Sequence, residues 1–158
     1  MRLQLVDRII ELEPGKRILV SKVLSRAEEY LADHFPKRPI MPGVFMLQIC
    51  VEAGMWLLYA NGDAPYGAVL TEVRNIRYGS MFEPGNEMRA VVEITGSENG
   101  RWKMKAEGHV GENRTISARM VLAPLAIEVA GKKLDRVAQK VKASLDERFA
   151  LIAPAAVK

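Results

Sequence analysis

The sequence contains few of the residues that cross-link chains or bind metals, with one cysteine and two histidines among 158 residues. Because Cys50 stands alone, a disulfide within the chain is excluded, and one thiol cannot by itself form a structural zinc site. A lone thiol fits a reducing compartment, so the composition favours a cytoplasmic protein.

Long hydrophobic runs are also scarce. Charged residues interrupt residues 1–16, which lack the continuous apolar core of a signal peptide. The longest apolar run, residues 44–60, approaches the length that crosses a bilayer, but Gln48 and Glu52 near its middle would be costly in lipid. We therefore expect a helix buried in protein and no membrane association.

The charge is only moderately unbalanced, at a net +4 with 27% charged and 49% apolar residues. These proportions are those of an ordinary soluble chain, and the length predicts one domain with one core. A net charge of this size favours acidic partners but not nucleic acid. Basic residues are denser near the end, so we divide the chain into a domain at 1–126 and an extension at 127–158.

A β-hairpin is predicted at the start of the chain. Residues 3–12 alternate imperfectly between apolar and polar, and residues 17–24 are typical of a returning strand. Between them, Pro14 and Gly15 provide the fixed and the positive φ of a type II turn.

Further antiparallel strands are predicted between about residues 68 and 122, with turns at 83–88 and 97–100. One face of these strands is apolar, and the buried helix is available to cover it. The predicted architecture is an α+β fold in which curved antiparallel strands surround one central helix. The residues expected to face the helix are Met88, Ala90, Val92, Ile94, Trp102, Met104, Ala106, Val110, Ile116, Ala118, Met120 and Leu122.

Two helices are predicted. Residues 34–43 contain three prolines and cannot be regular, but Pro42 suits the first turn of a helix over 44–59. Asn61-Gly62 is expected to end this helix through a left-handed cap. From Lys132 onward, apolar residues at steps of three and four predict an appended amphipathic helix, with Leu134, Val137, Val141, Leu145 and Phe149 on one face.

The two histidines differ in context. His34 precedes a helix N-terminus, where unpaired N–H groups and the positive end of the helix dipole favour a developing negative charge. His109 falls on the polar face of a predicted strand, which indicates a solvated surface residue.

Gln48 and Glu52 are the polar residues within the apolar helix. Their spacing of four places them on one helix face, about 6 Å apart along the axis. A buried carboxylate needs a polar partner or a cavity. The residue types alone leave two interpretations open, namely a hydrogen-bonded structural pair, including one across a dimer interface, and a functional site.

Three segments of the sequence carry a family resemblance. They are "LVDRIIELEPGKRI", "HFPKRPIMPGV" and "FEPGNEM", and they resemble the 3-hydroxyacyl-acyl-carrier-protein dehydratases of fatty-acid synthesis. The resemblance covers about residues 5–123 of the chain. It implies a hot-dog fold, at least a dimer, an active site at the dimer interface, and no metal or organic cofactor.

The resemblance also assigns roles to residues around the proline-rich loop. His34 matches the catalytic histidine of the family, and Gly43 matches the backbone amide that hydrogen-bonds the thioester carbonyl. Beside Gly43, we expect Pro42, Val44 and Phe45 to contact the substrate.

At the carboxylate position the sequence departs from the family pattern. The family has its catalytic carboxylate, supplied by the facing subunit, fourteen positions after the histidine, and this chain has Gln48 there. Four residues later, where the family usually has glutamine, it has Glu52. The two residue types are exchanged.

Dehydration requires a base for the α-proton, an acid for the departing 3-hydroxyl, and backbone donors for the enolate. His34 is the expected base. An amide cannot cycle a proton at physiological pH, so the acid is Glu52, a water held by Gln48, or absent. Our hypothesis is that the helix presents Glu52 in place of the missing carboxylate.

Other residues have two interpretations each. Phe45, Met46, Met55, Met81 and Phe82 either line an acyl-chain tunnel or pack in the core. Cys50 is expected to be an inert buried thiol. The tail either docks an acidic carrier protein or is a solvated helix face; its charged residues are Lys132, Lys133, Arg136, Lys140, Lys142 and Arg148 against Asp135, Asp146 and Glu147.

The sequence therefore predicts a cytoplasmic homodimer, or larger oligomer, that dehydrates 3-hydroxyacyl thioesters on acyl carrier protein or coenzyme A. Its rivals are a hot-dog acyl thioesterase and a catalytically silent acyl-thioester binder or partner subunit.

Overall fold

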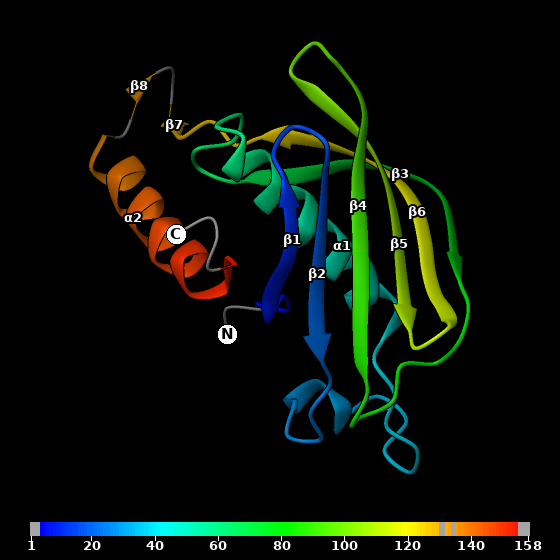
Figure 1. Ribbon diagram of the computed structural model, residues 1–158. Coiled ribbons are helices and arrows are strands. Elements are labelled where there is room, and N and C mark those ends of the chain that lie inside the picture. The colour runs from blue at the N-terminus through cyan, green and yellow to red at the C-terminus, as the bar shows by residue number, and fades with distance from the viewer. Residues whose placement is uncertain (1–3, 130–131, 134, 155–158) are drawn as a thin grey trace.

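A curved antiparallel sheet lies against a single long helix in the computed structural model, which describes residues 4–129, 132–133 and 135–154 (Figure 1). The sheet has the strand order β1-β2-β4-β5-β6-β3, and its strands are antiparallel throughout. The predicted architecture of strands around one helix is confirmed. The elements are β1 (Arg8–Glu13), β2 (Arg17–Val23), the 3-10 helix η1 (Glu29–Leu31), α1 (Gly43–Ala60), β3 (Ala68–Tyr78), β4 (Glu87–Glu98), β5 (Arg101–Val110), β6 (Asn113–Pro124), β7 (Glu128–Val129), β8 (Lys132–Lys133) and α2 (Asp135–Ile152).

β1 and β2 form the predicted hairpin, and its geometry explains the imperfect alternation. Ile9 pairs with Val20 and Glu11 with Leu19, so Ile10 is an extra residue at a β-bulge. A bulge shifts the side-chain alternation by one position.

The core lies between α1 and the inward face of the sheet. Gly54 shows how closely they approach, because a Cβ there would lie 2.8 Å from the sulfur of Met104. The inward residues predicted from the alternation are buried or half-buried, which confirms the assigned faces. The fully buried ones are Met88, Ala90, Val92, Met104, Ala106, Ile116, Ala118, Met120 and Leu122.

α1 begins and ends as predicted. Pro42 is its N-cap, and at the other end the N–H groups of Gly62 and Asp63 donate to the carbonyls of Tyr59 and Leu58. This pair of bonds is a Schellman motif, for which Gly62 supplies the positive φ of 84°. By length and composition α1 could cross a membrane, but 56% of it is buried inside the protein, as in a core helix.

The tail differs from the prediction in two respects. Residues 132–133 form β8, which pairs with β7, so helix begins at Asp135 rather than near Lys132. Val137 is 45% exposed and does not belong to the packed face. Leu134 lies outside the described residues. The strands of the sheet end at Pro124, and the domain division at 126 stays a prediction.

α2 packs beside the C-terminal half of α1 and next to the β1 side of the sheet (Figure 1). Phe149 contacts the rings of Trp56 and Tyr59, with centroids 5.8 and 5.6 Å apart. The Tyr59 hydroxyl donates to Asp146. α2 is therefore part of the same packed body as α1.

Candidate active site

His34 lies half-buried on the loop between η1 and α1, and one hydrogen bond sets its tautomer. Its Nδ1 is 3.0 Å from the carbonyl oxygen of Ile40. Because a carbonyl can only accept, Nδ1 carries the proton and donates it. Nε2 then has the lone pair and is the nitrogen that can take up a proton.

Backbone contacts fix the loop that holds His34. The N–H of Met41 donates to the carbonyl of Phe82 at 2.8 Å, and the N–H of Arg38 donates to that of Phe35 at 2.9 Å. Phe35 has a φ of 53°, a region that non-glycine residues rarely adopt and that requires support from its surroundings. The loop therefore presents the imidazole in a defined orientation.

Gly43 is the first residue of α1, so its N–H lies in the turn that lacks intrahelical acceptors. The ring of Tyr78 covers this position, because a Cβ on Gly43 would lie 3.0 Å from the Tyr78 Cε1 atom. A larger residue at this position would have to displace the Tyr78 ring or the helix start. Burial raises the pKa of Tyr78 above its ordinary value of 10.0, at which the hydroxyl is already protonated at neutral pH. Sequence reasoning missed Tyr78, whose sole signal is an aromatic residue at the end of a strand.

The three residues expected beside Gly43 diverge in space. The Pro42 carbonyl accepts from the N–H of Phe45 at 2.9 Å and so closes the first helical turn. Val44 is 63% exposed. Phe45 turns into the protein and packs edge-on against Tyr30, with ring centroids 4.6 Å apart. Val44 is therefore open to a ligand, whereas Phe45 supports the helix start.

Glu52 is 8% exposed and is hydrogen-bonded within its own chain. Its Oε2 accepts from the backbone N–H groups of Leu5 at 2.8 Å and Val6 at 3.1 Å, and Oε1 accepts from the indole N–H of Trp56 at 3.4 Å. Burial raises the pKa of Glu52, and these bonds and the positive charge of Arg148 oppose that rise in part. The carboxylate thus holds the N-terminal segment against α1.

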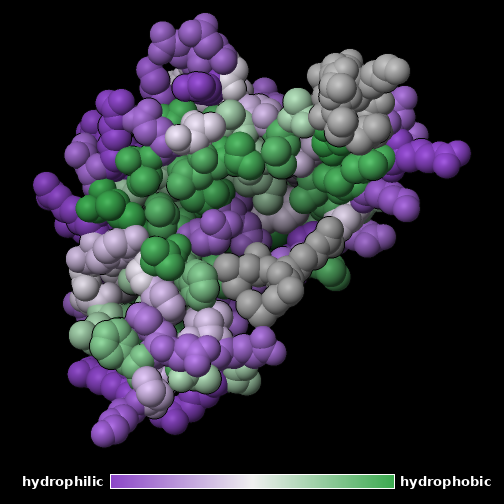
Figure 2. Space-filling view, turned by 180° about the vertical axis from the view of Figure 1, so that it is seen from behind, coloured by the Kyte–Doolittle hydropathy of each residue, from purple (hydrophilic) through white to green (hydrophobic). Residues whose placement is uncertain are grey.

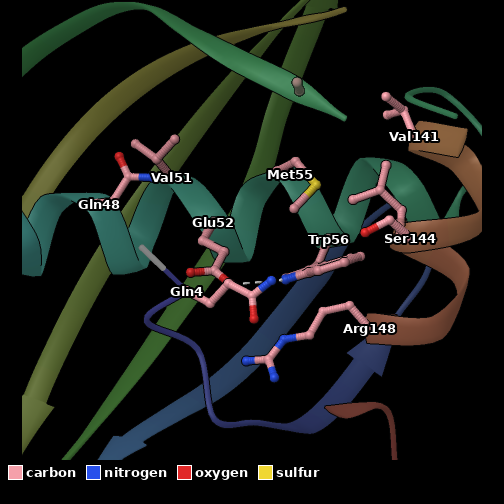
Figure 3. A pocket seen from close by; sticks show the side chains of 11 residues that line it. Gln4, Gln48, Val51, Glu52, Met55, Trp56, Val141, Ser144 and Arg148 are labelled. Carbon is pink, nitrogen blue, oxygen red and sulfur yellow. Dashed lines mark hydrogen bonds between the residues drawn. The ribbon is translucent and has the colours of Figure 1, made fainter. Parts of the chain in front are cut away.

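Gln48 is exposed, one turn before Glu52. In Figure 3 its amide extends from α1 away from the carboxylate of Glu52, which points toward Gln4 and the N-terminal segment. The spacing of four brings both residues to the same cavity, of about 260 Å³, between α1, α2 and the N-terminal segment. Within that cavity they have different surroundings.

His34 does not line this cavity. In one chain His34 is hydrogen-bonded to Ile40, two residues before the N-cap Pro42, whereas Gln48 and Glu52 line one cavity farther along the helix. The two groups do not form one site within a single protomer.

An apolar surface extends over α1 and the edge strand β3. Figure 2 shows a band of hydrophobic side chains across the face seen from behind the view of Figure 1. Val44 of α1 and Val73 and Tyr78 of β3 are exposed hydrophobic or aromatic residues, and Val73 and Tyr78 pair with the inward-facing Met120 and Ile116 of β6. Exposed apolar surface beside an unpaired strand edge is typical of a protein interface.

The remaining candidates lie elsewhere. His109 is half-buried on the outer face of β5, opposite Arg89 of β4. Cys50 is buried, and burial raises the pKa of its thiol to about 12, as expected for an inert cysteine. Of the five residues considered for an acyl tunnel, Met55 lines the cavity described above. Among the described residues, no group of three or more His, Cys, Asp or Glu is placed to hold a metal ion.

Solved structures define the class of fold. One chain of "The Dehydratase Heterocomplex ApeI:P from Xenorhabdus doucetiae" superposes with a TM-score of 0.59 at 14% identity, covering 77% of this chain and 99% of that one. A hypothetical thioesterase from Streptococcus pneumoniae TIGR4, solved with coenzyme A, gives 0.58 at 11% identity, covering 73% and 82%. The fold is the hot-dog fold.

Sequence comparison then gives the family. The FabA-like domain family matches residues 1–119. A 3-hydroxyacyl-[acyl-carrier-protein] dehydratase FabZ of Dechloromonas aromatica is 32% identical over 126 residues, covering 75% of this chain and 85% of the relative. That of Burkholderia thailandensis is 34% identical over 121 residues, covering 74% and 76%. The chain belongs to the FabA-like family, and α2 lies beyond the matched residues.

Proposed function

We propose that this protein removes water from 3-hydroxyacyl thioesters carried on acyl carrier protein, giving trans-2-enoyl thioesters. The observation that carries the proposal is the tautomer of His34, whose Nδ1–H bond to Ile40 leaves Nε2 as a base beside the N-terminus of α1. The relatives named as dehydratases support the same reaction.

His34 performs the proton transfers in this proposal. Nε2 removes the α-proton, and the Gly43 N–H and the helix N-terminus stabilise the oxyanion of the enolate. The imidazolium then gives that proton to the departing 3-hydroxyl, which leaves as water. One histidine can therefore balance the reaction without a second acid.

A second copy of the chain completes the site. The support for this is that His34 and Gln48 do not share a cavity in one protomer, and that α1 and β3 expose apolar side chains. β3 is an edge strand, so pairing with β3 of a second copy would extend the sheet and cover this surface.

Gln48 of the second copy is the residue we propose to orient the departing hydroxyl. Its amide is exposed and can donate to that oxygen. The alternative, which is our hypothesis from the sequence, is that Glu52 acts as the acid in place of the missing carboxylate. Against it stands the carboxylate's hydrogen bonding to Leu5, Val6 and Trp56, because a proton transfer there would disturb these bonds.

Assay of the purified protein with 3-hydroxyacyl-acyl carrier protein, read by mass spectrometry, tests the proposal. We expect trans-2-enoyl thioester from the wild type and none from His34→Ala. Release of free acid would identify a thioesterase, and binding without turnover would identify a silent binder. If the wild type is inactive and Gln48→Glu is active, Glu52 does not replace the carboxylate.

Coenzyme A thioesters tested in parallel would show which carrier is used. Exposed basic residues on α2, such as Arg136 and Lys140, are available to an acidic carrier protein. Arg148 is not among them, since it is half-buried and donates to the carbonyl of Val6. The cytoplasmic location stays a prediction.

A further inference from the structure

The cavity at Gln48 has a wall that lies outside the residues matched by the family. Val51 and Met55 of α1 continue the cavity from Gln48 toward the C-terminal half of the helix. There, Val141 and Leu145 of α2 form the opposite wall. Figure 3 shows α2 standing across this end of α1, with Val141 and Ser144 on its near side.

Contacts on both sides of the cavity hold α2 in this position. Arg148 donates to the Val6 carbonyl, and the Val6 N–H in turn donates to Glu52 of α1. Phe149 packs on Trp56, in the same region of α1. α2, the N-terminal segment and α1 are therefore joined through one carboxylate and one aromatic cluster.

The dimensions of the cavity limit what it can hold. Gln48 and Met55 are seven positions apart, which is about 10 Å along a helix. Within one protomer the cavity has a volume of about 260 Å³, which lies below the range of pockets that take drug-sized ligands, beginning at about 300 Å³. Val51, Met55 and Leu145 make an apolar side that suits an alkyl chain, whereas Glu52 and Arg148 add polar groups on the side of the N-terminal segment.

We propose that α2 closes the far end of the acyl-chain pocket and restricts this protein to short and medium chains. The inference rests on the proposed function, because it takes the reacting end of the thioester to lie at Gln48. Leu145 and Val141 are then specificity-determining residues, and their size sets how many methylene groups fit beyond the reacting carbons.

The test measures kcat/KM for 3-hydroxyacyl-acyl carrier proteins of increasing chain length. We expect kcat/KM of the wild type to decline sharply as the acyl chain lengthens. For the shortest chains that the wild type rejects, Leu145→Ala should raise kcat/KM about tenfold, since one methylene in an apolar pocket changes specificity by at least that factor. Leu145→Trp should move the limit to shorter chains. Val137→Ala, an exposed position on the same helix, is the matched control.

Two opposite shifts exclude a folding defect, because partial unfolding of α2 would affect both Leu145 variants in the same direction. An identical length profile in Leu145→Ala, Leu145→Trp and Val137→Ala would overturn the proposal.

Binding separates this inference from the reaction itself. Calorimetry measures the affinity for carrier proteins that bear saturated acyl chains of different lengths. These chains lack the 3-hydroxyl, so no turnover occurs. If no variant forms an enoyl product, the proposed function fails. The proposed length limit is still supported if the dependence of affinity on chain length shifts in the Leu145 variants, and it is rejected if that dependence does not change.

Discussion

The two ends of α1 differ in how much of their site one protomer provides. At the N-terminal end, His34 and Gly43 are fixed by the chain's own loop and β3, yet Val44 beside them is exposed. At the C-terminal end, Glu52 and Trp56 are covered by the N-terminal segment and α2. The first end leaves apolar side chains exposed, whereas at the second the chain's own segments cover most of the polar groups.

This difference separates two polar residues that the sequence places together. Gln48 lies toward the open end and keeps its amide available, whereas the Glu52 carboxylate has donors on both oxygens. We infer that the open end performs chemistry and that the closed end supports structure and selects chain length. Substitutions at each end should therefore change different measured quantities.

The largest effect is expected from His34→Ala. Removing the base should lower kcat for enoyl formation by about a thousandfold, within the range of general acid–base catalysis, with little change in melting temperature because the ring is half-buried on a loop. His109→Ala is the control and should retain the wild-type rate. A His34→Ala enzyme with more than a tenth of that rate would assign the base elsewhere.

Gln48→Ala should come next, with a loss of about a hundredfold in kcat, because the departing hydroxyl would lose its oriented donor. Stability should change little, since Gln48 is exposed. Steady-state assays and thermal melts of the same preparations check both statements. Loss of stability with unchanged kcat would make Gln48 a structural residue.

Gly43→Ala should cost about tenfold in kcat/KM, because a new Cβ at 3.0 Å from the Tyr78 ring must displace either the ring or the helix start. The three atoms nearest to the added Cβ all belong to the Tyr78 ring, so the double variant Gly43→Ala, Tyr78→Ala should recover most of the loss. Failure of the second substitution to restore activity would show that the glycine is needed for another reason.

At the closed end, Glu52→Ala should lower the free energy of unfolding by about 1–3 kcal/mol, because the buried N–H groups of Leu5 and Val6 lose their acceptor. Urea denaturation of the variant and wild type measures this. An unchanged midpoint would mean that the N-terminal segment does not depend on this carboxylate.

The smallest predicted effect is a pH dependence. The folded-state pKa of Glu52 is raised from its ordinary value of 4.5, so the folded chain binds this proton more tightly than the unfolded chain. The stability that protonated Glu52 contributes is fully present below its pKa in the unfolded chain. It is lost as pH rises through its pKa in the folded chain. Between these two pKa values, the free energy of unfolding of the wild type relative to Glu52→Gln should therefore fall as pH rises. An increase would show that the folded-state pKa of Glu52 is lowered instead of raised.

Much of the fold follows from the sequence because its signals are local. The alternation at Met88 to Val92 and the Pro42 start of α1 each reflect the conformation of neighbouring residues. β7 and β8 were missed because two-residue strands carry no periodic signal. Val137 was misassigned because helical periodicity does not indicate how far along the helix packing extends.

The loop and the helix that hold the candidate site could be predicted from the sequence, but the contacts of its side chains could not. Prolines and a histidine before a helix identify the loop, but the bond from His34 to Ile40 depends on how the loop folds. The donors to Glu52 are backbone N–H groups 46 and 47 positions away, which have no sequence signature. From these contacts we infer that Glu52 supports the structure, which the residue type alone could not indicate; its catalytic role stays a prediction.

The most direct test asks whether the base and the orienting amide come from different copies. His34→Ala and Gln48→Ala chains carrying different affinity tags are co-expressed, and the mixed dimer is purified through both tags. In a symmetric dimer with shared sites the mixed species has one intact site, so it should regain about half of the wild-type rate per dimer. A mixed dimer no more active than its two parents, or a wild-type chain that stays monomeric while active, would contradict a site shared between two copies.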